Sequence, residues 1–181
     1  MGCMPETAAQ NQIVSVAVVD DDANVRHGLW WLLNNIAGLR CAGAFASCRE
    51  FQASLAEPPD ILLLDVSMPE TSGIDSVQPI KTKFPATKII MHSNFDDEDK
   101  ISRSRRAGAR GYVLKNALAP QLYEAILRVH RGGAAWPPGF EPEESHPSVS
   151  LPSSTPSSAK LAPFLMPAAK CADLPFCKIN H

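Results

Sequence analysis

Five side chains that can do chemistry stand at the ends of short apolar segments of this 181-residue chain: Asp20, Asp21, Asp65, Ser93 and Lys115. Three carboxylates held together repel one another, and a carboxyl pKa rises unless a cation compensates. Mg²⁺ suits such a site, because it prefers oxygen ligands and keeps several of its waters. The ammonium of Lys115 would add a second positive charge, and the hydroxyl of Ser93 a hydrogen-bond donor.

A carboxylate held between a metal ion and a lysine is suited to attack a phosphoryl group. The two cations would neutralise the charge on the transferring oxygens, while the protein contributes mainly positioning. Asp65 follows the unbroken apolar run ILLL, which is typical of a strand buried on both faces of a parallel sheet. The side chains therefore predict phosphoryl chemistry if the fold brings them together.

The elements that must position these side chains alternate in type along residues 13–133. Strands are expected at 13–19, 40–45, 61–64, 88–92 and 111–115. Helices are expected from residue 23, after residue 47, after residue 73, at 96–107 and at 120–131. Five such units in a row predict an α/β fold, a five-stranded parallel sheet with helices on both faces. Ligands of these sheets bind beyond the carboxyl ends of the strands.

Composition excludes several classes of protein. The formal net charge of −2 indicates neither a nucleic-acid nor a membrane partner for the chain as a whole. No apolar run approaches the roughly 18 residues of a membrane span, and the first residues lack a signal-peptide pattern. The five cysteines are scattered without metal-ligand spacing, which is typical of reduced thiols in a cytoplasmic protein.

A change of composition predicts where the folded part ends. Residues 137–175 contain nine of the sixteen prolines, together with Ser-rich stretches. We therefore expect a flexible N-terminus at 1–12, one domain at 13–133, and a disordered tail at 134–181.

Four motifs resemble, in order and spacing, those of response-regulator receiver domains of two-component signalling. They are VVDDDANVR, LLLDVSMPETSG, IIMHS and GYVLK, and the resemblance covers about residues 13–133. It implies a flavodoxin-like topology and a cytoplasmic phosphorelay protein. Such a protein is a phosphoacceptor that catalyses its own phosphotransfer and slow dephosphorylation, rather than an enzyme acting on other molecules.

The resemblance also implies a metal site and a phosphoacceptor. Asp65 would accept a phosphoryl group from a histidine kinase or a phosphotransfer protein. Mg²⁺ would be bound by Asp20, Asp21 and Asp65, together with the backbone carbonyl of Ser67. Asp22 lies one residue past the acidic pair, where it is better suited to cap the following helix than to bind the metal.

A switch is implied as well. Ser93 and Lys115 would contact the phosphoryl group, and Tyr112 occupies the aromatic switch position of the family. The fourth helix has little apolar surface beyond Ile101 and Ala107, so it is expected to be weakly anchored. Phosphorylation is therefore expected to change the face formed by the fourth helix, the fifth strand and the fifth helix.

Several positions depart from the usual receiver pattern. Asn94 stands where a small residue is common, and Phe95 where the family tunes the attack of water; with Ser67 these residues are expected to control access to the phosphoryl group. Phe95 is expected to slow phosphoryl loss. Pro79 falls inside the third helix, which is therefore expected to be short or kinked. Asn116 replaces a proline that many other receivers also lack.

Trp30 and Trp31 lie beside the apolar stripe of the first helix rather than within it. At least one is expected to be half exposed, and exposed tryptophan is a common interface anchor. Receivers of this type meet kinases or form homodimers through this helix. Packing at the edge of the core is an equally weighted alternative.

The run GGAAWPPG resembles the start of the linker in LuxR-type (NarL-like) regulators. In that subfamily a helix-turn-helix DNA-binding domain follows. The remaining residues lack helical periodicity, and their prolines would interrupt a recognition helix, so DNA binding is not supported by this chain. The chain is thus either a receiver with a native extension, or a truncated or frame-shifted regulator.

Two other functions remain as alternatives. Asp20 and Asp22 have the spacing of the nucleophile and acid in Mg²⁺-dependent phosphohydrolases of the haloacid-dehalogenase type. That family also needs an acidic pair after its lysine, and here Asp96 and Asp97 precede Lys115. A pseudo-receiver that acts without phosphorylation would have lost an acid, the lysine or the acceptor, and none is lost.

Overall fold

The computed structural model describes residues 13–54, 57–69 and 71–140. Within them, five parallel strands form one sheet in the order β2-β1-β3-β4-β5. The strands are β1 (Val14–Val19), β2 (Leu39–Phe45), β3 (Ile61–Asp65), β4 (Lys88–Ser93) and β5 (Gly111–Leu114). The helices are α1 (Ala23–Asn35), α2 (Cys48–Ser54), α3 (Gly73–Lys83), α4 (Glu98–Ala107) and α5 (Ala119–His130). The expected flavodoxin-like fold is confirmed.

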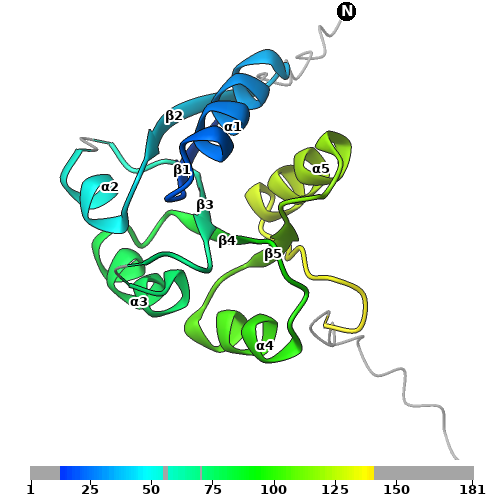
Figure 1. Ribbon diagram of the computed structural model, residues 1–181. Helices are drawn as coiled ribbons and strands as arrows, with labels where there is room; N and C mark the ends of the chain where they lie inside the picture. Colours follow the sequence, from blue (N-terminus) through cyan, green and yellow to red (C-terminus); the bar gives the residue numbers. More distant parts are fainter. Residues whose placement is uncertain (1–12, 55–56, 70, 141–181) are drawn as a thin grey trace, which may run out of the picture. The chain divides into compact units, whose positions relative to one another are not determined.

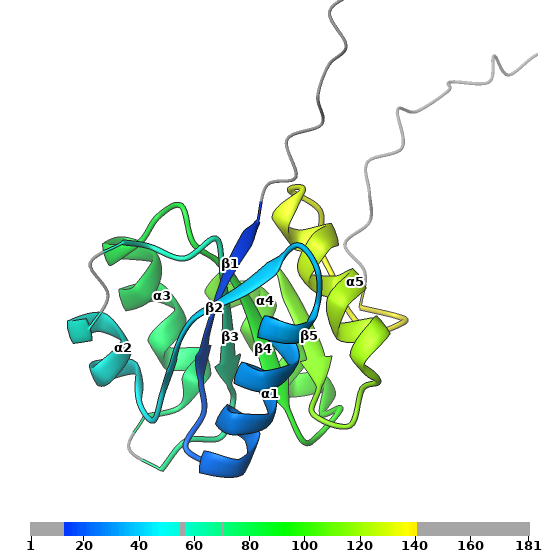
Figure 2. The same cartoon turned by 90° about the horizontal axis from the view of Figure 1, so that it is seen from above.

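The helices cover both faces of the sheet, α1 and α5 on one and α2, α3 and α4 on the other (Figures 1 and 2). Leu33 and Ile126 fill the core beneath α1 and α5, while Phe51 and Ile80 fill the core beneath α2 and α3. Successive strand residues alternate between these two cores, as the two-residue period of a strand requires. Within the described ranges, no helix has the length and apolarity to cross a lipid bilayer.

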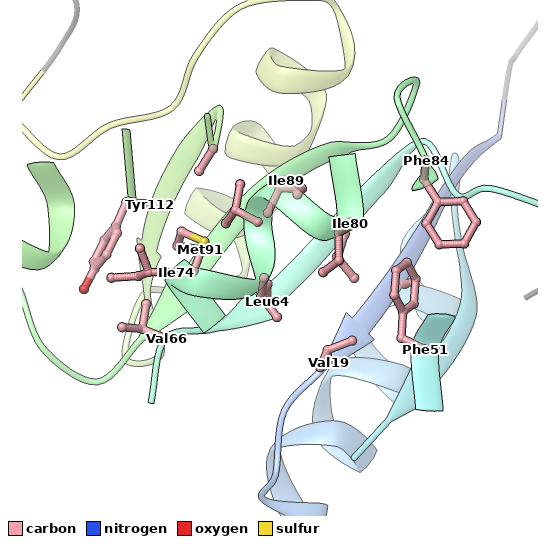
Figure 3. Packing of buried hydrophobic residues seen from close by; sticks show 14 of the residues in the cluster. Val19, Phe51, Leu64, Val66, Ile74, Ile80, Phe84, Ile89, Met91 and Tyr112 are labelled. Carbon is pink, nitrogen blue, oxygen red and sulfur yellow. The ribbon is translucent and has the colours of Figure 1, made fainter. Parts of the chain in front are cut away.

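Aromatic rings and the central strand dominate the core on the α2–α3 side (Figure 3). Phe51 meets Phe45 and Phe84 edge to face, with ring centroids 5.7 and 5.4 Å apart, a favourable aromatic geometry. Strand β3 lies in the middle of the sheet and is buried along its whole length. The apolar run that precedes Asp65 is therefore a strand buried on both faces, as predicted.

Side chains expected to cap helices do so. The carboxylate of Asp22 accepts a hydrogen bond from the backbone N–H of Asn24 at 2.8 Å, at the start of α1. The hydroxyl of Ser47 accepts one from the N–H of Glu50 at 3.2 Å, at the start of α2. These contacts pair N–H groups that a helix terminus leaves without partners.

Helix α3 runs through Pro79 for four more residues, so the expectation that this proline shortens the helix is wrong. The proline ring is exposed, whereas Ile74, Val77 and Ile80 on the opposite side are buried. Burial of this apolar face stabilises the helix enough to tolerate the backbone hydrogen bond that proline cannot make.

Ordered structure continues past the boundary expected after Gly133. Ala135 forms a parallel bridge with Gly111 at the outer edge of β5, and Trp136 is buried in the core beside α4. Proline and small residues suggested a tail here, but the ring of Trp136 anchors the chain as far as Phe140. The expectations for residues 1–12 and 141–181 fall outside the described part of the chain.

Candidate functional site

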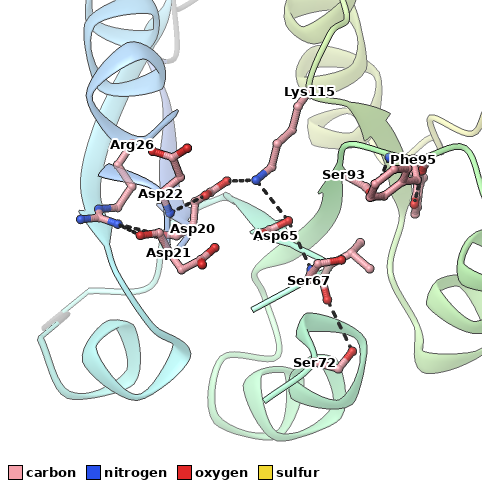
Figure 4. Close-up of polar contacts among 12 residues, drawn as sticks. Asp20, Asp21, Asp22, Arg26, Asp65, Ser67, Ser72, Ser93, Phe95 and Lys115 are labelled. Atoms are coloured by element: carbon pink, nitrogen blue, oxygen red, sulfur yellow. Dashed lines mark hydrogen bonds and ion pairs between the residues drawn. The ribbon is translucent and has the colours of Figure 1, made fainter. Parts of the chain in front are cut away.

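The carboxyl ends of four neighbouring strands bring the predicted side chains to one edge of the sheet (Figure 4). Asp20 directly follows β1, Asp65 and Ser93 are the last residues of β3 and β4, and Lys115 directly follows β5. The parallel register aligns these strand ends with one another. The side chains that the sequence pattern predicted to converge therefore do so, at the edge where parallel sheets bind ligands.

Lys115 joins two of the carboxylates. Its Nζ lies 2.7 Å from Oδ2 of Asp20 and 3.3 Å from Oδ1 of Asp65. All three side chains are almost fully buried. A buried charge is costly unless it is paired, so the lysine and the two acids depend on one another.

Asp21 completes a group of three carboxylates. One oxygen from each of Asp20, Asp21 and Asp65 lies within 4.8 Å of the others, and Asp21 is exposed to solvent. Three negative charges face the single ammonium of Lys115, which leaves net negative charge at an opening to water. This donor set, all oxygen and partly open, fits a hard divalent cation such as Mg²⁺.

The acidic turn after β1 is held in shape by its own backbone and by Arg26. The N–H of Asp22 donates to Oδ1 of Asp20 at 3.0 Å. The guanidinium of Arg26 donates to the backbone carbonyls of Asp20 and Asp21 at 2.7 and 2.9 Å. Sequence reasoning missed Arg26. The available signal was a cation one turn into a helix that follows three acids.

Gly73 sets the shape of the loop after Asp65. A Cβ built on Gly73 would lie only 1.8 Å from the backbone carbonyl oxygen of Asp65, so no other residue fits without moving the loop. The N–H of Gly73 donates to the carbonyl of Val66 at 3.1 Å, which closes the loop onto the end of β3. The start of α3 therefore lies directly against the end of β3.

Burial and charge compete at the site. Burial raises the pKa of Asp65, the charge of Lys115 lowers it, and the charge of Asp20 raises it, with a net rise. Burial acts to lower the pKa of Lys115, but its hydrogen bond with Asp20 and the charge of Asp65 outweigh that effect and raise it. The ammonium therefore stays protonated, while the Asp65 carboxylate favours a further cation.

A chain of hydrogen bonds links Ser93 to Tyr112. Ser93 is buried, and its Oγ accepts a hydrogen bond from the N–H of Phe95 at 3.2 Å. The hydroxyl of Tyr112 donates to the carbonyl of Phe95 at 2.7 Å. The ring of Phe95 is exposed, and the Nζ of Lys100 lies 5.1 Å from its centroid. The loop after β4 thus joins Ser93 to Tyr112 through the backbone of Phe95.

Of the remaining expected residues, Ser67 contacts Asp65, Asn94 follows Ser93 at the end of β4, and the tryptophans lie on α1. The N–H of Ser67 donates to Oδ1 of Asp65 at 3.3 Å, and Asn94 directly follows Ser93 in an exposed position. Trp30 and Trp31 lie on α1 with 52% and 62% of their surface exposed. At least one of these tryptophans was predicted to be half exposed, and the structure shows that both are.

His92 is a buried neighbour that sequence reasoning passed over. It stands level with Asp65 on the adjacent strand, and burial, aided by the charge of Lys115, lowers its pKa to about 4. Within the described part of the chain, its Nδ1 has no hydrogen-bond partner. A histidine inside an apolar strand gives no clear signal of its role, because it could face either core or solvent.

Comparison with known proteins establishes the family. Residues 16–127 match the model of the response regulator receiver domain. The chain belongs to this family. The matched residues include Asp20, Asp21, Asp65 and Lys115, and the match does not favour the haloacid-dehalogenase alternative.

Curated relatives of the receiver domain agree. The chain is 35% identical over 122 residues to the uncharacterized transcriptional regulatory protein YxjL of Bacillus subtilis (strain 168), covering 67% of this chain and 56% of YxjL. It is 36% identical over 121 residues to the oxygen regulatory protein NreC of Staphylococcus epidermidis, with 66% and 56% covered. The chain thus spans about half the length of these relatives.

Solved structures share the fold. A LuxR-family two-component response regulator from Aurantimonas sp. SI85-9A1 aligns with TM-score 0.66 and 26% identity, over 71% of this chain and 93% of that one. The receiver domain of the response regulator NarL from Mycobacterium tuberculosis aligns with TM-score 0.63 and 24% identity, over 67% and 98%. The expected likeness to LuxR-type receivers is confirmed.

Proposed function

We propose that this receiver accepts a phosphoryl group on Asp65 from a phosphohistidine of a histidine kinase or a phosphotransfer protein. An Oδ of Asp65 forms a bond to phosphorus as the P–N bond of the phosphohistidine breaks, and the imidazole leaves. The observation that carries this proposal is a buried acceptor carboxylate between Lys115 and two further carboxylates. It supports an in-line transfer that depends on positioning and charge.

Each neighbouring residue has a separate task in this proposal. Asp20, Asp21, Asp65 and the backbone carbonyl of Ser67 would hold Mg²⁺, which would supply positive charge beside the transferring oxygens. Lys115 contacts a phosphoryl oxygen, since its ammonium already lies against Asp65. These residues make the chain a phosphoacceptor that assists its own phosphorylation.

The response to phosphorylation passes through the loop after β4. Ser93 donates its hydroxyl to a phosphoryl oxygen, and Tyr112 follows because its hydroxyl is bonded to the same loop. The face formed by α4, β5 and α5 then changes. The exposed rings of Trp30 and Trp31 on α1 supply a separate contact surface for the kinase or for a second copy of the chain.

Incubation with acetyl phosphate and Mg²⁺, followed by mapping of the acid-labile adduct by mass spectrometry, tests the proposal. We expect one phosphoryl group on Asp65, no adduct in Asp65→Asn, and a normal adduct in Asp75→Asn, an exposed aspartate on α3. Chelation of Mg²⁺ should abolish labelling in every variant. An adduct on Asp20 would instead favour a phosphohydrolase, and complete absence of labelling would favour a phosphorylation-independent module.

A further inference from the structure

Residues 134–140, here called the strap, lie along the outer edge of β5 and continue towards α4 (Figure 1). The N–H of Ala135 donates to the carbonyl of Arg110 at 3.0 Å, and the N–H of Tyr112 donates to the carbonyl of Ala135 at 2.8 Å. Trp136 then enters the buried cluster that contains Tyr112, and Phe140 packs against that cluster. The strap therefore covers an edge strand that would otherwise be open.

The seat of the strap is shaped for it. A Cβ on Gly111 would lie 2.8 Å from the carbonyl oxygen of Ala135, closer than side-chain carbon atoms approach backbone oxygens. The backbone of Gly111 does not have a positive φ, so conformation does not require glycine there. Glycine at this position instead leaves room for the backbone of the strap.

Within the described residues, three hydrogen bonds join the strap to the rest of the chain: two along the edge of β5, and one from the guanidinium of Arg105 on α4 to the carbonyl of Phe140 at 3.4 Å. Pro137 has no N–H, so the strap cannot donate to the next carbonyl along β5, and the ladder stops after two hydrogen bonds. A cavity of about 430 Å³ borders the strap where it faces α5, lined in part by Trp136 and Arg128. A fitted seat with incomplete packing suits a segment that detaches.

One residue connects the strap to the phosphorylation site. Tyr112 donates its backbone N–H to Ala135 of the strap and its hydroxyl to the carbonyl of Phe95. The N–H of Phe95 in turn donates to Oγ of Ser93. A shift of the loop after Ser93 therefore reaches the strap through a single residue, Tyr112.

We propose that the strap is an autoinhibitory element whose docking opposes phosphorylation of Asp65, an inference that rests on the proposed function. Turning the Ser93 hydroxyl towards a phosphoryl group weakens its hydrogen bond from Phe95. The loop then shifts, and Tyr112 loses the partner that holds it beneath the strap. Because coupling between two sites is reciprocal, phosphorylation releases the strap, and a strap that cannot dock favours the phosphorylated form.

A pair of glycine variants tests this coupling. Gly111→Ala places a methyl group against the strap, whereas Gly28→Ala on α1 places the same group where nothing lies within 4 Å. Binding of beryllofluoride with Mg²⁺, a phosphoryl mimic, is measured on the full chain by calorimetry. We expect Gly111→Ala to bind at least about fivefold more tightly than the wild type, and Gly28→Ala to bind equally. Equal or weaker binding by Gly111→Ala overturns the proposal.

A second variant covers the case in which Gly111→Ala does not fold. Ala135→Pro removes the N–H that donates to Arg110 and changes none of the fully buried core residues, and it should tighten beryllofluoride binding in the same way. If it folds and binds no more tightly than the wild type, the autoinhibitory role is wrong.

Movement of the strap is read directly from Trp136. In the full chain carrying Trp30→Phe and Trp31→Phe, Trp136 is the one remaining tryptophan, and acrylamide quenching of its emission reports its exposure. We expect quenching to rise when beryllofluoride binds, with no rise in Asp65→Asn. If beryllofluoride binds without an increase in quenching of Trp136, the proposal that phosphorylation releases the strap is wrong, while the proposed function is unaffected. Absence of beryllofluoride binding in every variant overturns both.

Discussion

Lys115 and Asp65 show how single residues at this site depend on their surroundings. The lysine keeps its proton although it is buried, because two carboxylates face it, and Asp65 is held between that lysine and a second acid. A buried cation is costly alone and stable when paired. The ammonium of Lys115 therefore makes negative charge at Asp65 less costly than it would be in an apolar protein interior.

Phe95 is expected to protect the phosphorylated form. Its ring lies in the loop directly after Ser93, with Lys100 over one face, where it can keep water from an in-line approach to phosphorus. Phe95→Ala should lose phosphoryl from Asp65 several-fold faster, measured as decay of the labelled chain after donor removal. Leu118→Ala, another exposed apolar side chain, serves as the control. An unchanged decay rate in Phe95→Ala would refute the protective role.

His92 makes stability depend on pH. Its pKa is about 4 in the folded chain, against about 6.5 for an unperturbed histidine. As pH falls from 6.5 to 4, the unfolded chain binds a proton that the folded chain does not, so stability falls by up to about 3 kcal/mol. Above pH 6.5 the residue contributes nothing to the slope.

Urea unfolding between pH 4.5 and 7 checks this expectation. His92→Gln should show a shallower loss of unfolding free energy than the wild type, whereas His27→Gln, an exposed histidine on α1, should keep the wild-type slope. Identical slopes for the wild type and His92→Gln would show that His92 is not the responsible group.

Sequence alone predicted that side chains following four of the strands would lie together, since parallel strands bring their carboxyl ends to one edge of the sheet. It missed Arg26, because a cation one turn into a helix after three acids is only a weak signal for contacts with backbone carbonyls. It also missed His92, whose orientation within a strand depends on tertiary packing. Residues that act through the backbone or through burial become visible only in three dimensions.

At the scale of elements, α3 shows that packing overrides local preference. Pro79 lies on the exposed side of a helix whose other side is buried. Pro79→Ala should raise the unfolding free energy by about 2 kcal/mol, because the restored hydrogen bond and removed clash outweigh the greater freedom of the unfolded chain. Pro85→Ala, in the loop after the helix, should bring no gain. An unchanged urea midpoint in Pro79→Ala would contradict this.

Element types and order were predictable because apolar periodicity differs between helices and strands. The predicted start of α4 at Asp96 was two residues early, since Asp97 caps the helix with its side chain rather than joining it. Capping of this kind cannot be assigned with confidence in a run of four successive acids. The sequence predicted that α4 exists, but only the structure shows at which residue it begins.

At the scale of the whole molecule, the strap extends the folded unit. Trp136 is buried, whereas Trp30 is half exposed. Trp136→Ala should lower the unfolding free energy by about 3 kcal/mol, since it empties space in the core, and Trp30→Ala by less than about 1 kcal/mol. Chemical denaturation measures the unfolding free energy of the two variants. An equal decrease in both would mean that Trp136 of the strap does not contribute to the core.

The extent of the domain was the least predictable feature. Composition changes at Gly132 and Gly133, and prolines follow, so the pattern indicated a tail. The contact between Gly111 and Ala135 joins residues far apart in the chain. No local sequence pattern shows that Gly111 lacks a side chain because the backbone of Ala135, more than twenty residues later, packs against it.

The ion pair between Lys115 and Asp20 has a consequence for synthesis of the protein. The two residues flank almost the entire sheet in sequence, and Asp65 lies between them. A chain still emerging from the ribosome holds both acids long before the lysine appears, and long-range parallel pairing forms slowly. Under the proposed function, a nascent chain therefore lacks a complete phosphoryl-accepting site until β5 and Lys115 have emerged.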